Sequence, residues 1–365
     1  MAASLPEGQG GGASKRPGPR ARPTRVLMLT ASYHPHPGGV EKHLRCVTRE
    51  LRAIGVEVRI ATPAREQPEG EDLVDSVSVT RLSAHRRAAR HALEPLVDWA
   101  DIIHSHDAYP FLKFYLPFSL RSGARPAFVT FHGYERYPIP LEARVLRRIV
   151  RWRTRGSLCA GAFIPKWYRF TCGHITHGGV DAPPVRPPLG RGAVFAGRLE
   201  PDTGLLCYLE ALRLLKEEHS IAVPLQVLGD GSLRPQAEAF CAEHGLEAEF
   251  AGMVSDVMPF LREARFALCS GLLSMLEAMA CGALVLAVYD NPLKEDYLRL
   301  SPTAGFASVA GDPATLANQL LCLSDPPAAE EVARRAFEFA RTQTWRAVAE
   351  LYLDLWSSLT AEEAP

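Results

Sequence analysis

The sequence predicts an α/β protein built from two doubly wound domains that face each other across a cleft. Two series of short apolar runs, each as long as a strand, alternate with amphipathic helical segments, which is typical of parallel sheets. The chain has 365 residues, a length that suits two domains. A stiff segment rich in proline and glycine, APPVRPPLGRG at 182–192, separates the two series.

The first series follows a Gly-, Pro- and Arg-rich stretch at 1–24. This stretch has too little apolar surface to offset chain entropy and is predicted to be a disordered tail. RVLMLT at 25–30 is a buried strand, and 40–55 is a helix because its apolar positions step by three and four residues. Further strands are predicted at 56–62, 77–82, 100–106 and 127–133.

The second series repeats the alternation of strand and helix. Strands are predicted at 192–199, 225–231, 264–270 and 283–290, and helices at 204–219, 234–245, 312–324, 328–341 and 345–360. We therefore expect an N-terminal domain over 25–182, a linker over 183–191 and a C-terminal domain over 192–344. Ligands of such sheets bind at the carboxyl ends of the strands and, with two domains, in the cleft between them.

Composition excludes several classes of protein. Hydrophobic content is 47% and charged content 22%, as in globular proteins, and no apolar run reaches the ~18 residues of a membrane span. The eight cysteines form no C-x-x-C pair, so reduced thiols and a cytoplasmic protein are expected. Residues 1–190 carry 28 Lys and Arg against 16 Asp and Glu, whereas the remainder carries 13 against 25. This asymmetry indicates either an anionic partner for the first half or ordinary variation in surface composition.

Two loops at predicted strand ends carry candidate chemistry in the N-terminal half. Gly38 and Gly39 join the first strand to the first helix, where backbone amides favour an anion or an acceptor, although a flexible turn would have the same composition. His132 follows the strand at 127–133 and could act on a substrate hydroxyl or be structural. The nearby HSHD at 104–107 matches no standard metal-ligand spacing, so no metal is expected.

The C-terminal half has similar loops. Gly197 and Arg198 end a strand in VFAGRLEPDTG, where the guanidinium could reach a phosphate bidentately. Gly229 and Gly231 in VLGDGSL leave room for a flat base or a ribose. Each of these patterns is weak alone, and neither half has a G-x-G-x-x-G fingerprint.

Glu277 is the one acid in the apolar stretch CSGLLSMLEAMACG. Ser274 and Glu277 have the spacing of a capping box, with Ser274 as N-cap and Glu277 at the third helical position. That interpretation explains the acid without any ligand.

The segment LEARVLRRIVRWRTRG at 141–156 is predicted to be an amphipathic helix with separate basic and apolar stripes. The apolar stripe comprises Leu141, Val145, Ile149 and Trp152, and the basic stripe comprises Arg144, Arg148, Arg151 and Arg155. The helix could lie on an anionic membrane or bind a phosphate-bearing acceptor, or it could be an ordinary helix packed over the sheet with a solvated face. Nucleic acid is not favoured, because no aromatic residues interleave with the basic ones.

Taken together, these pieces resemble the retaining nucleotide-sugar glycosyltransferases of the GT-B fold, in the group with the E-x7-E motif that includes mannosyl- and glucosyltransferases. The resemblance covers residues 25–360 and rests on the order and spacing of its motifs. The matching pieces are the Gly-Gly loop with VEKH, ADIIHSHD, FHG, HGGVD at 177–181, FAGRL, LGDG, LEAMACG at 276–282 and TW at 344–345.

The resemblance implies roles for individual residues. The N-terminal domain would bind the acceptor, the C-terminal domain the sugar nucleotide, and residues 345–365 would form a helix that crosses back to the N-terminal domain. Arg198 would hold the diphosphate, Glu277 would accept hydrogen bonds from the ribose, and His132 would contact the donor sugar. Gly38 and Gly39 would frame the reaction centre. The amides at the helix N-terminus, formed by Gly271, Leu272, Leu273 and Ser274, would face phosphate, with no metal or other cofactor.

Two positions depart from the family pattern. The family usually has a Lys a few residues after G-R-L, where this chain has Thr203, and the first Glu of E-x7-E is replaced by Cys269. Lys294, just beyond the next strand, is a candidate for the missing cation.

Three functions are therefore compatible with the sequence. The favoured one is a hexosyltransferase that uses a nucleotide-diphospho-sugar and a glycan, lipid-phosphate or small-molecule acceptor, on the cytoplasmic face of a membrane if it contacts one. The alternatives are a degenerate GT-B protein that binds nucleotide or glycan without transfer, which Thr203 and Cys269 suggest, and a nucleotide-sugar epimerase of the same fold.

Overall fold

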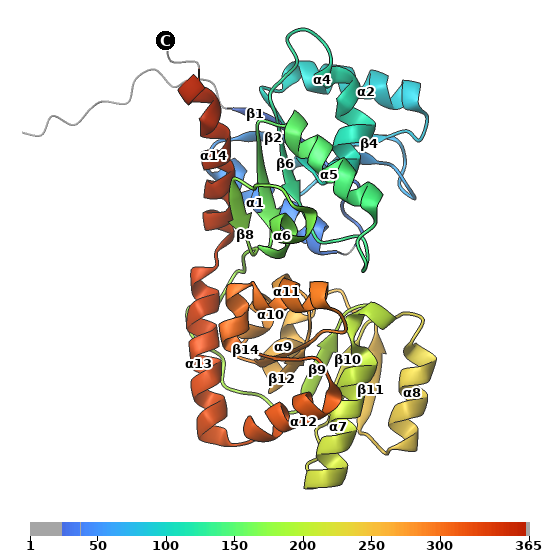
Figure 1. Cartoon of the computed structure of the whole chain (residues 1–365), viewed down its shortest axis with the longest axis vertical. Helices are drawn as coiled ribbons and strands as arrows, with labels where there is room; N and C mark the ends of the chain where they lie inside the picture. Colours follow the sequence, from blue (N-terminus) through green and yellow to red (C-terminus); the bar gives the residue numbers. More distant parts are fainter. Residues whose placement is uncertain (1–23, 37, 363–365) are drawn as a thin grey trace, which may run out of the picture.

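The computed structural model describes residues 24–36 and 38–362, with side chains to residue 357. Two α/β halves lie one above the other along the long axis of the molecule (Figure 1). The predicted disordered tail, apart from Thr24, lies outside the described residues. None of the described helices combines the length and apolarity that a membrane span requires.

The first half contains an eight-stranded sheet in the order β3-β4-β2-β1-β5-β6-β7-β8. All neighbouring strands pair in parallel except β3, which pairs with β4 as an antiparallel hairpin. The strands are β1 (Arg25–Leu29), β2 (Glu57–Pro63), β3 (Gly70–Val74), β4 (Val77–Leu82), β5 (Ile102–His106), β6 (Ala127–Phe131), β7 (Gly156–Ala160) and β8 (His174–Thr176). The helical segments are α1 (Gly39–Ala53), α2 (Arg86–Trp99), α3 (Ala108–Pro110), η1 (Phe111–Tyr115), α4 (Leu116–Ser119), α5 (Leu141–Arg153) and α6 (Phe163–Tyr168).

The second half contains a six-stranded parallel sheet in the order β11-β10-β9-β12-β13-β14. The strands are β9 (Ala193–Ala196), β10 (Leu225–Leu228), β11 (Ala248–Gly252), β12 (Phe266–Leu268), β13 (Leu284–Val288) and β14 (Ala307–Ala310). The helical segments are η2 (Pro201–Thr203), α7 (Leu205–His219), α8 (Arg234–Glu243), α9 (Met258–Glu263), α10 (Leu272–Ala280), α11 (Pro292–Arg299), η3 (Pro302–Phe306), α12 (Pro313–Cys322), α13 (Pro326–Thr342) and α14 (Trp345–Glu362).

Each sheet is buried on both faces, which explains its continuous apolar strands. Side chains alternate between faces along a strand, so Leu27 and Leu29 of β1 join one core cluster while Val26 and Met28 join another. The second sheet likewise separates two clusters. The predicted parallel, doubly wound architecture is present in both halves.

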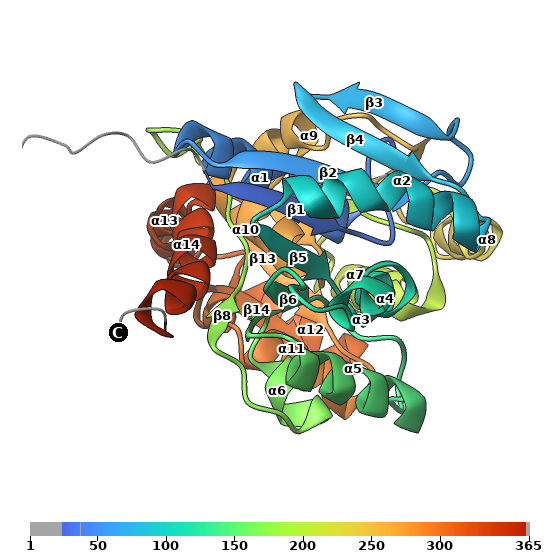
Figure 2. The ribbon, with the colours of Figure 1, turned by 90° about the horizontal axis from the view of Figure 1, so that it is seen from above.

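The last helix, α14, belongs to the second half by sequence but packs on the first. It contacts α1, β7 and β8, and its Trp345, Tyr352 and Trp356 are buried among the strands of the first sheet. Figure 2 shows α13 and α14 along the same side of the molecule. The predicted return of the C-terminal helix is therefore seen in the structure.

Candidate functional site

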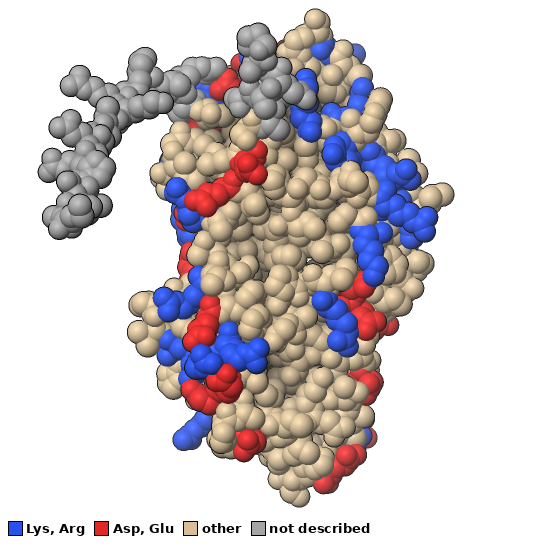
Figure 3. All heavy atoms as spheres, turned by 60° about the vertical axis from the view of Figure 1, so that its left-hand side comes forward, with Lys and Arg blue, Asp and Glu red and all other residues tan. Residues whose placement is uncertain are grey.

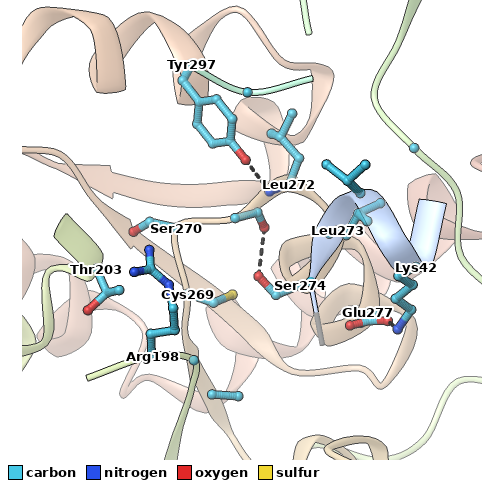
Figure 4. A pocket seen from close by; sticks show the side chains of 18 of the residues that line it. Lys42, Arg198, Thr203, Cys269, Ser270, Leu272, Leu273, Ser274, Glu277 and Tyr297 are labelled. Carbon is cyan, nitrogen blue, oxygen red and sulfur yellow. Dashed lines mark hydrogen bonds and ion pairs between the residues drawn. The ribbon is translucent and has the colours of Figure 1, made fainter. Parts of the chain in front are cut away.

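A cavity of about 540 Å³ lies between the halves, at the carboxyl ends of several parallel strands. Most of the predicted site residues line it: Gly38, Gly39, His132, Gly197, Arg198, Gly271, Leu272, Leu273, Ser274 and Glu277. It is also lined by residues that sequence reasoning did not assign to the site, among them Lys42, His43, Ser270 and Tyr297. Figure 4 shows part of the lining, with Arg198 near one end and Lys42 and Glu277 near the other.

Gly229 and Gly231 are not among the residues that line this cavity, and their contact with a base or ribose stays a prediction. The structure shows a packing reason for glycine at these positions. Gly229 has a φ of 145°, and a Cβ there would lie 1.9 Å from the carbonyl oxygen of Gly197. The β10 loop thus packs backbone to backbone against the loop that carries Arg198.

The capping box predicted at Ser274 and Glu277 is wrong. Helix α10 begins at Leu272, two residues before Ser274, and its N-cap Gly271 has no side chain to bond the free amides. The Ser274 hydroxyl instead donates to the Gly271 carbonyl at 2.8 Å. The sequence placed the start of the helix too late, because its true first residues, Leu272 and Leu273, are apolar and lack the polar residues that usually mark a helix N-terminus.

The N-terminus of α10 still presents donors to the cavity. The Leu272 amide is occupied, because it donates to the Tyr297 hydroxyl at 2.9 Å. The amides of Leu273 and Ser274 lie in the first turn and have no acceptor within the helix. The positive end of the helix therefore faces the cavity, which favours an anion.

Glu277 is buried one turn further along α10 and forms an ion pair with Lys42 of α1. The two side chains come from opposite halves and meet at one end of the cavity (Figure 4). Burial lowers the pKa of Lys42 below its usual value. A carboxylate in this place can accept hydrogen bonds from a diol if Lys42 moves or shares it.

Arg198 follows β9 at the other end of the cavity. Its side chain is 69% exposed, and its Nη2 atom lies 2.8 Å from Oδ2 of Asp202. Thr203 provides no charge and donates its hydroxyl to the Glu200 carbonyl at 2.7 Å. Burial raises the pKa of Cys269 to about 12, so this position holds a neutral thiol where the family has a carboxylate.

Four histidines, His43, His104, His106 and His132, are packed together beneath the N-terminal wall of the cavity. Burial lowers the pKa of His43 to about 4 and of His104 to about 3, and it lowers the pKa values of His106 and His132 well below 6.5. All four are therefore neutral at physiological pH. Among the described residues, no group of three or more His, Cys, Asp or Glu side chains is placed to hold a metal ion.

Hydrogen bonds fix the tautomers of two of these histidines. Trp356 donates to Nδ1 of His104 at 3.0 Å, so His104 carries its proton on Nε2 and donates to Thr130 at 2.8 Å. Thr130 donates to the Tyr352 hydroxyl at 3.0 Å, which donates to Nε2 of His43 at 2.9 Å. This series of hydrogen bonds runs in one direction, from Trp356 of α14 to His43 at the cavity. Because Nε2 of His43 accepts the last bond, His43 carries its proton on Nδ1.

His132 is held from several sides. Its Nε2 lies 3.0 Å from Nδ1 of His106, its backbone amide donates to Asp107 at 3.0 Å, and its carbonyl accepts from Arg147 at 3.1 Å. The Nε2 atom of His106 is buried without a described partner. If His106 carries its proton on Nδ1, its partnerless Nε2 atom keeps only a lone pair, which costs less than a buried N–H without an acceptor. His106 then donates to Nε2 of His132, and His132 carries its own proton on Nδ1. Burial raises the pKa of Asp107 to about 6, against the effect of Arg147.

Helix α5 lies away from this cavity and differs in part from its prediction. It ends at Arg153, so Arg155 lies outside the helix and its basic stripe. The Arg151 Nε donates to the Thr171 carbonyl at 3.0 Å, whereas Arg148 is exposed and Arg144 half-buried. The apolar stripe does not pack on the sheet, because Leu141, Val145, Ile149 and Trp152 are 75%, 47%, 42% and 79% exposed. The face toward the protein carries the buried Arg147 and Val150.

Comparison with known proteins agrees with this geometry. Residues 37–164 match the family described as Glycosyltransferase Family 4, and residues 190–325 match Glycosyl transferases group 1. A phosphatidyl-myo-inositol mannosyltransferase of Mycobacterium leprae is 28% identical over 378 residues, covering 92% of this chain and 97% of the relative.

Solved structures show the same fold at low sequence identity. Sucrose-phosphate synthase from Thermosynechococcus elongatus superposes with a TM-score of 0.70 at 16% identity, covering 94% of this chain and all of the other. Anabaena HepE in complex with UDP gives a TM-score of 0.68 at 15% identity over 92% of this chain and 100% of the other. The fold predicted from sequence is thus confirmed, and the chain belongs to the glycosyltransferases of the GT-B fold.

Proposed function

We propose that this protein transfers a hexose from a nucleotide-diphospho-sugar to an acceptor, with retention of the anomeric configuration. The observation that carries the proposal is the composition of one cavity. Arg198, the α10 N-terminus and Glu277 line it from the second half, and His132 lines it from the first. In a sugar nucleotide, Arg198 and the α10 N-terminus would serve the diphosphate, Glu277 the ribose and His132 the sugar.

The leaving diphosphate would be stabilised by protein groups, without a metal or other cofactor. The Arg198 guanidinium and the amides of Leu273 and Ser274 face the same cavity. Fixed donors of this kind stabilise charge that develops during bond cleavage at little reorganisation cost. His132 would donate its Nδ1–H to a hydroxyl of the donor sugar, and Gly38 and Gly39 would leave space beside the reacting carbon.

For the acceptor we propose a lipid-phosphate at the cytoplasmic face of an anionic membrane. Support comes from α5, whose exposed apolar stripe is flanked by Arg144 and Arg148. Lys and Arg side chains also gather on one side of the first half (Figure 3). An apolar stripe beside basic side chains suits a helix lying in a membrane interface. The mannosyltransferase relative is named for a lipid, phosphatidyl-myo-inositol.

Isothermal titration with UDP, GDP and ADP tests the donor assignment. At least one is expected to bind, and a protein that binds none of them does not use a nucleotide-diphospho-sugar. The anomeric configuration of a product, read by NMR, tests retention.

A degenerate binding protein is the second candidate, and Cys269 and Thr203 are the observations that favour it. The neutral thiol and the hydroxyl bonded to Glu200 leave the sugar and diphosphate end of the cavity poorer in charge than the family pattern. Glycosyl transfer or donor hydrolysis that is lost in His132→Ala would reject this candidate. Conversion of a sugar nucleotide without any acceptor would indicate an epimerase instead.

A further inference from the structure

Lys294 lies at the diphosphate end of the cavity, on the first turn of α11. Its backbone amide donates to the N-cap side chain of Asn291 at 2.9 Å, which fixes the start of the helix. Its Nζ atom donates to the carbonyl of Ser270 at 2.7 Å and lies 4.5 Å from the centre of the Tyr297 ring. The ammonium is thus held at the turn that leads from β12 into the N-terminus of α10.

Hydrogen bonds hold this turn against the neighbouring strand. The Ser270 hydroxyl accepts from the Val288 amide at 2.9 Å and bonds the Tyr208 hydroxyl at 2.8 Å. Tyr208 in turn donates to the Leu286 carbonyl at 3.1 Å. Ser270 and Tyr208 are both buried. The carbonyl that receives Lys294 is therefore anchored to the neighbouring strand β13.

The surroundings of Lys294 compensate its charge only in part. Within the described residues it forms no ion pair with a carboxylate, and the N-termini of α10 and α11, both positive, lie close to it. Burial lowers the pKa of Lys294 to about 8, although Asp202 and Asp290 act to raise it. An ammonium has three donors and the Ser270 carbonyl uses one, so this half-buried cation is stabilised when an anion enters the cavity.

The rest of the diphosphate end is short of positive charge. Arg198 is already paired with Asp202, and Thr203 is neutral and faces the Glu200 carbonyl. A diphosphate carries more negative charge than one paired guanidinium can balance. Lys294 lines the same cavity as Arg198 and Thr203 and approaches it from the opposite loop.

We propose that Lys294 is the second cation that binds the diphosphate of the donor, supplying from α11 the charge that the chain lacks at Thr203. This proposal rests on the proposed function, because it assumes a nucleoside diphosphate group in the cavity. The competing explanation is purely structural, with Lys294 joining α11 to the end of β12 through the Ser270 carbonyl.

The test compares the affinity of each variant for a nucleoside diphosphate and for the matching nucleoside by isothermal titration. The diphosphate is whichever of UDP, GDP and ADP the unmodified protein binds best. Lys294→Met should weaken diphosphate binding at least about tenfold and change nucleoside binding less than about twofold, because a buried charge contact is removed only from the phosphates. Lys294→Arg should retain most of the diphosphate affinity.

A rescue variant separates charge from structure. Lys294→Met combined with Thr203→Lys restores a cation at the position where the family has one, so it should recover diphosphate affinity. A structural bond to Ser270 would not be restored by this change. Lys216→Met is the matched control, because Lys216 is also half-buried on the second half and donates to the carbonyls of His244 and Gly245 at 3.0 and 2.5 Å, away from the cavity.

Diphosphate affinity within twofold of the unmodified protein in Lys294→Met would overturn the proposal, as would equal losses for diphosphate and nucleoside. If Lys294→Met is unfolded by circular dichroism, Lys294→Gln takes its place with the same two criteria. Failure of the unmodified protein to bind any of the three diphosphates is a different result, since it removes the proposed function itself and this inference with it.

Discussion

Lys42 and Glu277 form an ion pair that connects helix α1 of the first half to helix α10 of the second. The acid that the family pattern assigns to the ribose is therefore already engaged, and its partner comes from the opposite side of the cavity. A ribose that hydrogen-bonds to Glu277 must displace Lys42 or share the carboxylate with it. If Glu277 binds the ribose, donor binding and the contact between the halves would be coupled through one carboxylate.

Lys42→Met should tighten nucleoside binding by about two- to fivefold, because Glu277 no longer gives up an ion pair when ribose arrives. The Lys42 side chain is 44% exposed, and an ion pair of this kind contributes up to about 1 kcal/mol. This energy sets the upper limit of the expected gain in affinity. Isothermal titration measures the change. Arg45→Met is the control, because Arg45 lies on the same helix as Lys42 and this change removes its exposed ion pair with Asp75. Weaker binding in Lys42→Met would mean that Lys42 itself contacts the donor.

Arg198→Ala should weaken diphosphate binding by about ten- to a hundredfold and leave nucleoside binding nearly unchanged. A charge-assisted bond to phosphate is worth about 1.5–3 kcal/mol and has no counterpart in the nucleoside. Because Arg198 is exposed, its removal should not alter the melting temperature. Equal losses of affinity for the diphosphate and the nucleoside would mean that Arg198 does not bind the diphosphate.

The buried histidines predict a loss of stability in acid. His43 and His104 have folded pKa values of about 4 and about 3, below the value of about 6.5 expected for an unfolded chain. At these histidines the unfolded chain therefore binds more protons below pH 6.5, so their contribution to the free energy of unfolding falls as the pH drops from 6.5 to 4 and is level above 6.5. The raised pKa of Asp107, about 6, acts in the opposite sense between pH 6 and 4 and offsets part of this loss. His43 alone accounts for about 3 kcal/mol at the acid end.

Thermal unfolding at pH 7.5, 6.0, 5.0 and 4.5 checks this profile, with the steepest decline expected below pH 6. His91 is exposed on α2, so His91→Gln should leave the profile unchanged. A melting temperature that is constant from pH 7.5 to 4.5 would contradict the assignment of neutral, buried rings.

Tyr352→Phe should interrupt the chain of hydrogen bonds between α14 and His43. The Tyr352 hydroxyl is the link between Thr130 and Nε2 of His43, and its loss leaves two buried groups short of a partner. We expect the free energy of unfolding to fall by about 1–3 kcal/mol. Nitrogen-15 NMR should show the Nδ1–H tautomer of His43 in the unmodified protein and a mixture in the variant.

Tyr109→Phe is the control for this experiment, because Tyr109 is 53% exposed and its hydroxyl, within the described part of the chain, bonds only with Lys113 on the surface. A single His43 tautomer that persists in Tyr352→Phe would show that the tautomer is set by other contacts.

Trp152→Ser should weaken binding to vesicles of mixed phosphatidylserine and phosphatidylcholine by at least about fivefold in a flotation or tryptophan-fluorescence titration. Its side chain is 79% exposed on the apolar stripe of α5, and burying an aromatic ring in the interface contributes more than 1 kcal/mol. Leu73→Ser on β3, which removes an apolar side chain that is 70% exposed elsewhere, should have no effect. If the two variants bind vesicles equally well, α5 is not the membrane contact.

The sequence predicted the long apolar strands and the amphipathic helices, because continuous burial on both faces leaves a strong pattern. It did not indicate β3, whose GEDLV segment is mostly exposed and forms only as the edge of a hairpin with β4. It also missed β7, β8, β11 and β14, of which β8, β11 and β14 pair at sheet edges and β7 is a short inner strand of mostly small residues. Such strands are determined by their neighbours and not by their own composition.

The site was predictable where a motif fixes a loop and unpredictable where contacts join distant parts of the chain. Arg198 and His132 follow strands and line the cavity as expected. Lys42 lies within the VEKH motif, but its pairing with Glu277 depends on how the two halves meet. The exposed stripe on α5 was equally hidden, since amphipathicity shows that a helix has two faces without showing which one is covered.

The return of α14 to the first sheet also affects how the protein can be made. During synthesis the N-terminal half emerges first, yet Trp345, Tyr352 and Trp356, which complete its core, are translated after the second half. Until α14 emerges, the part of that core cluster which α1 does not cover is apolar and exposed, a condition that favours aggregation and chaperone binding. Nascent chains that end before Trp345 should therefore be cut readily by protease within the first half, whereas released full-length chains should resist.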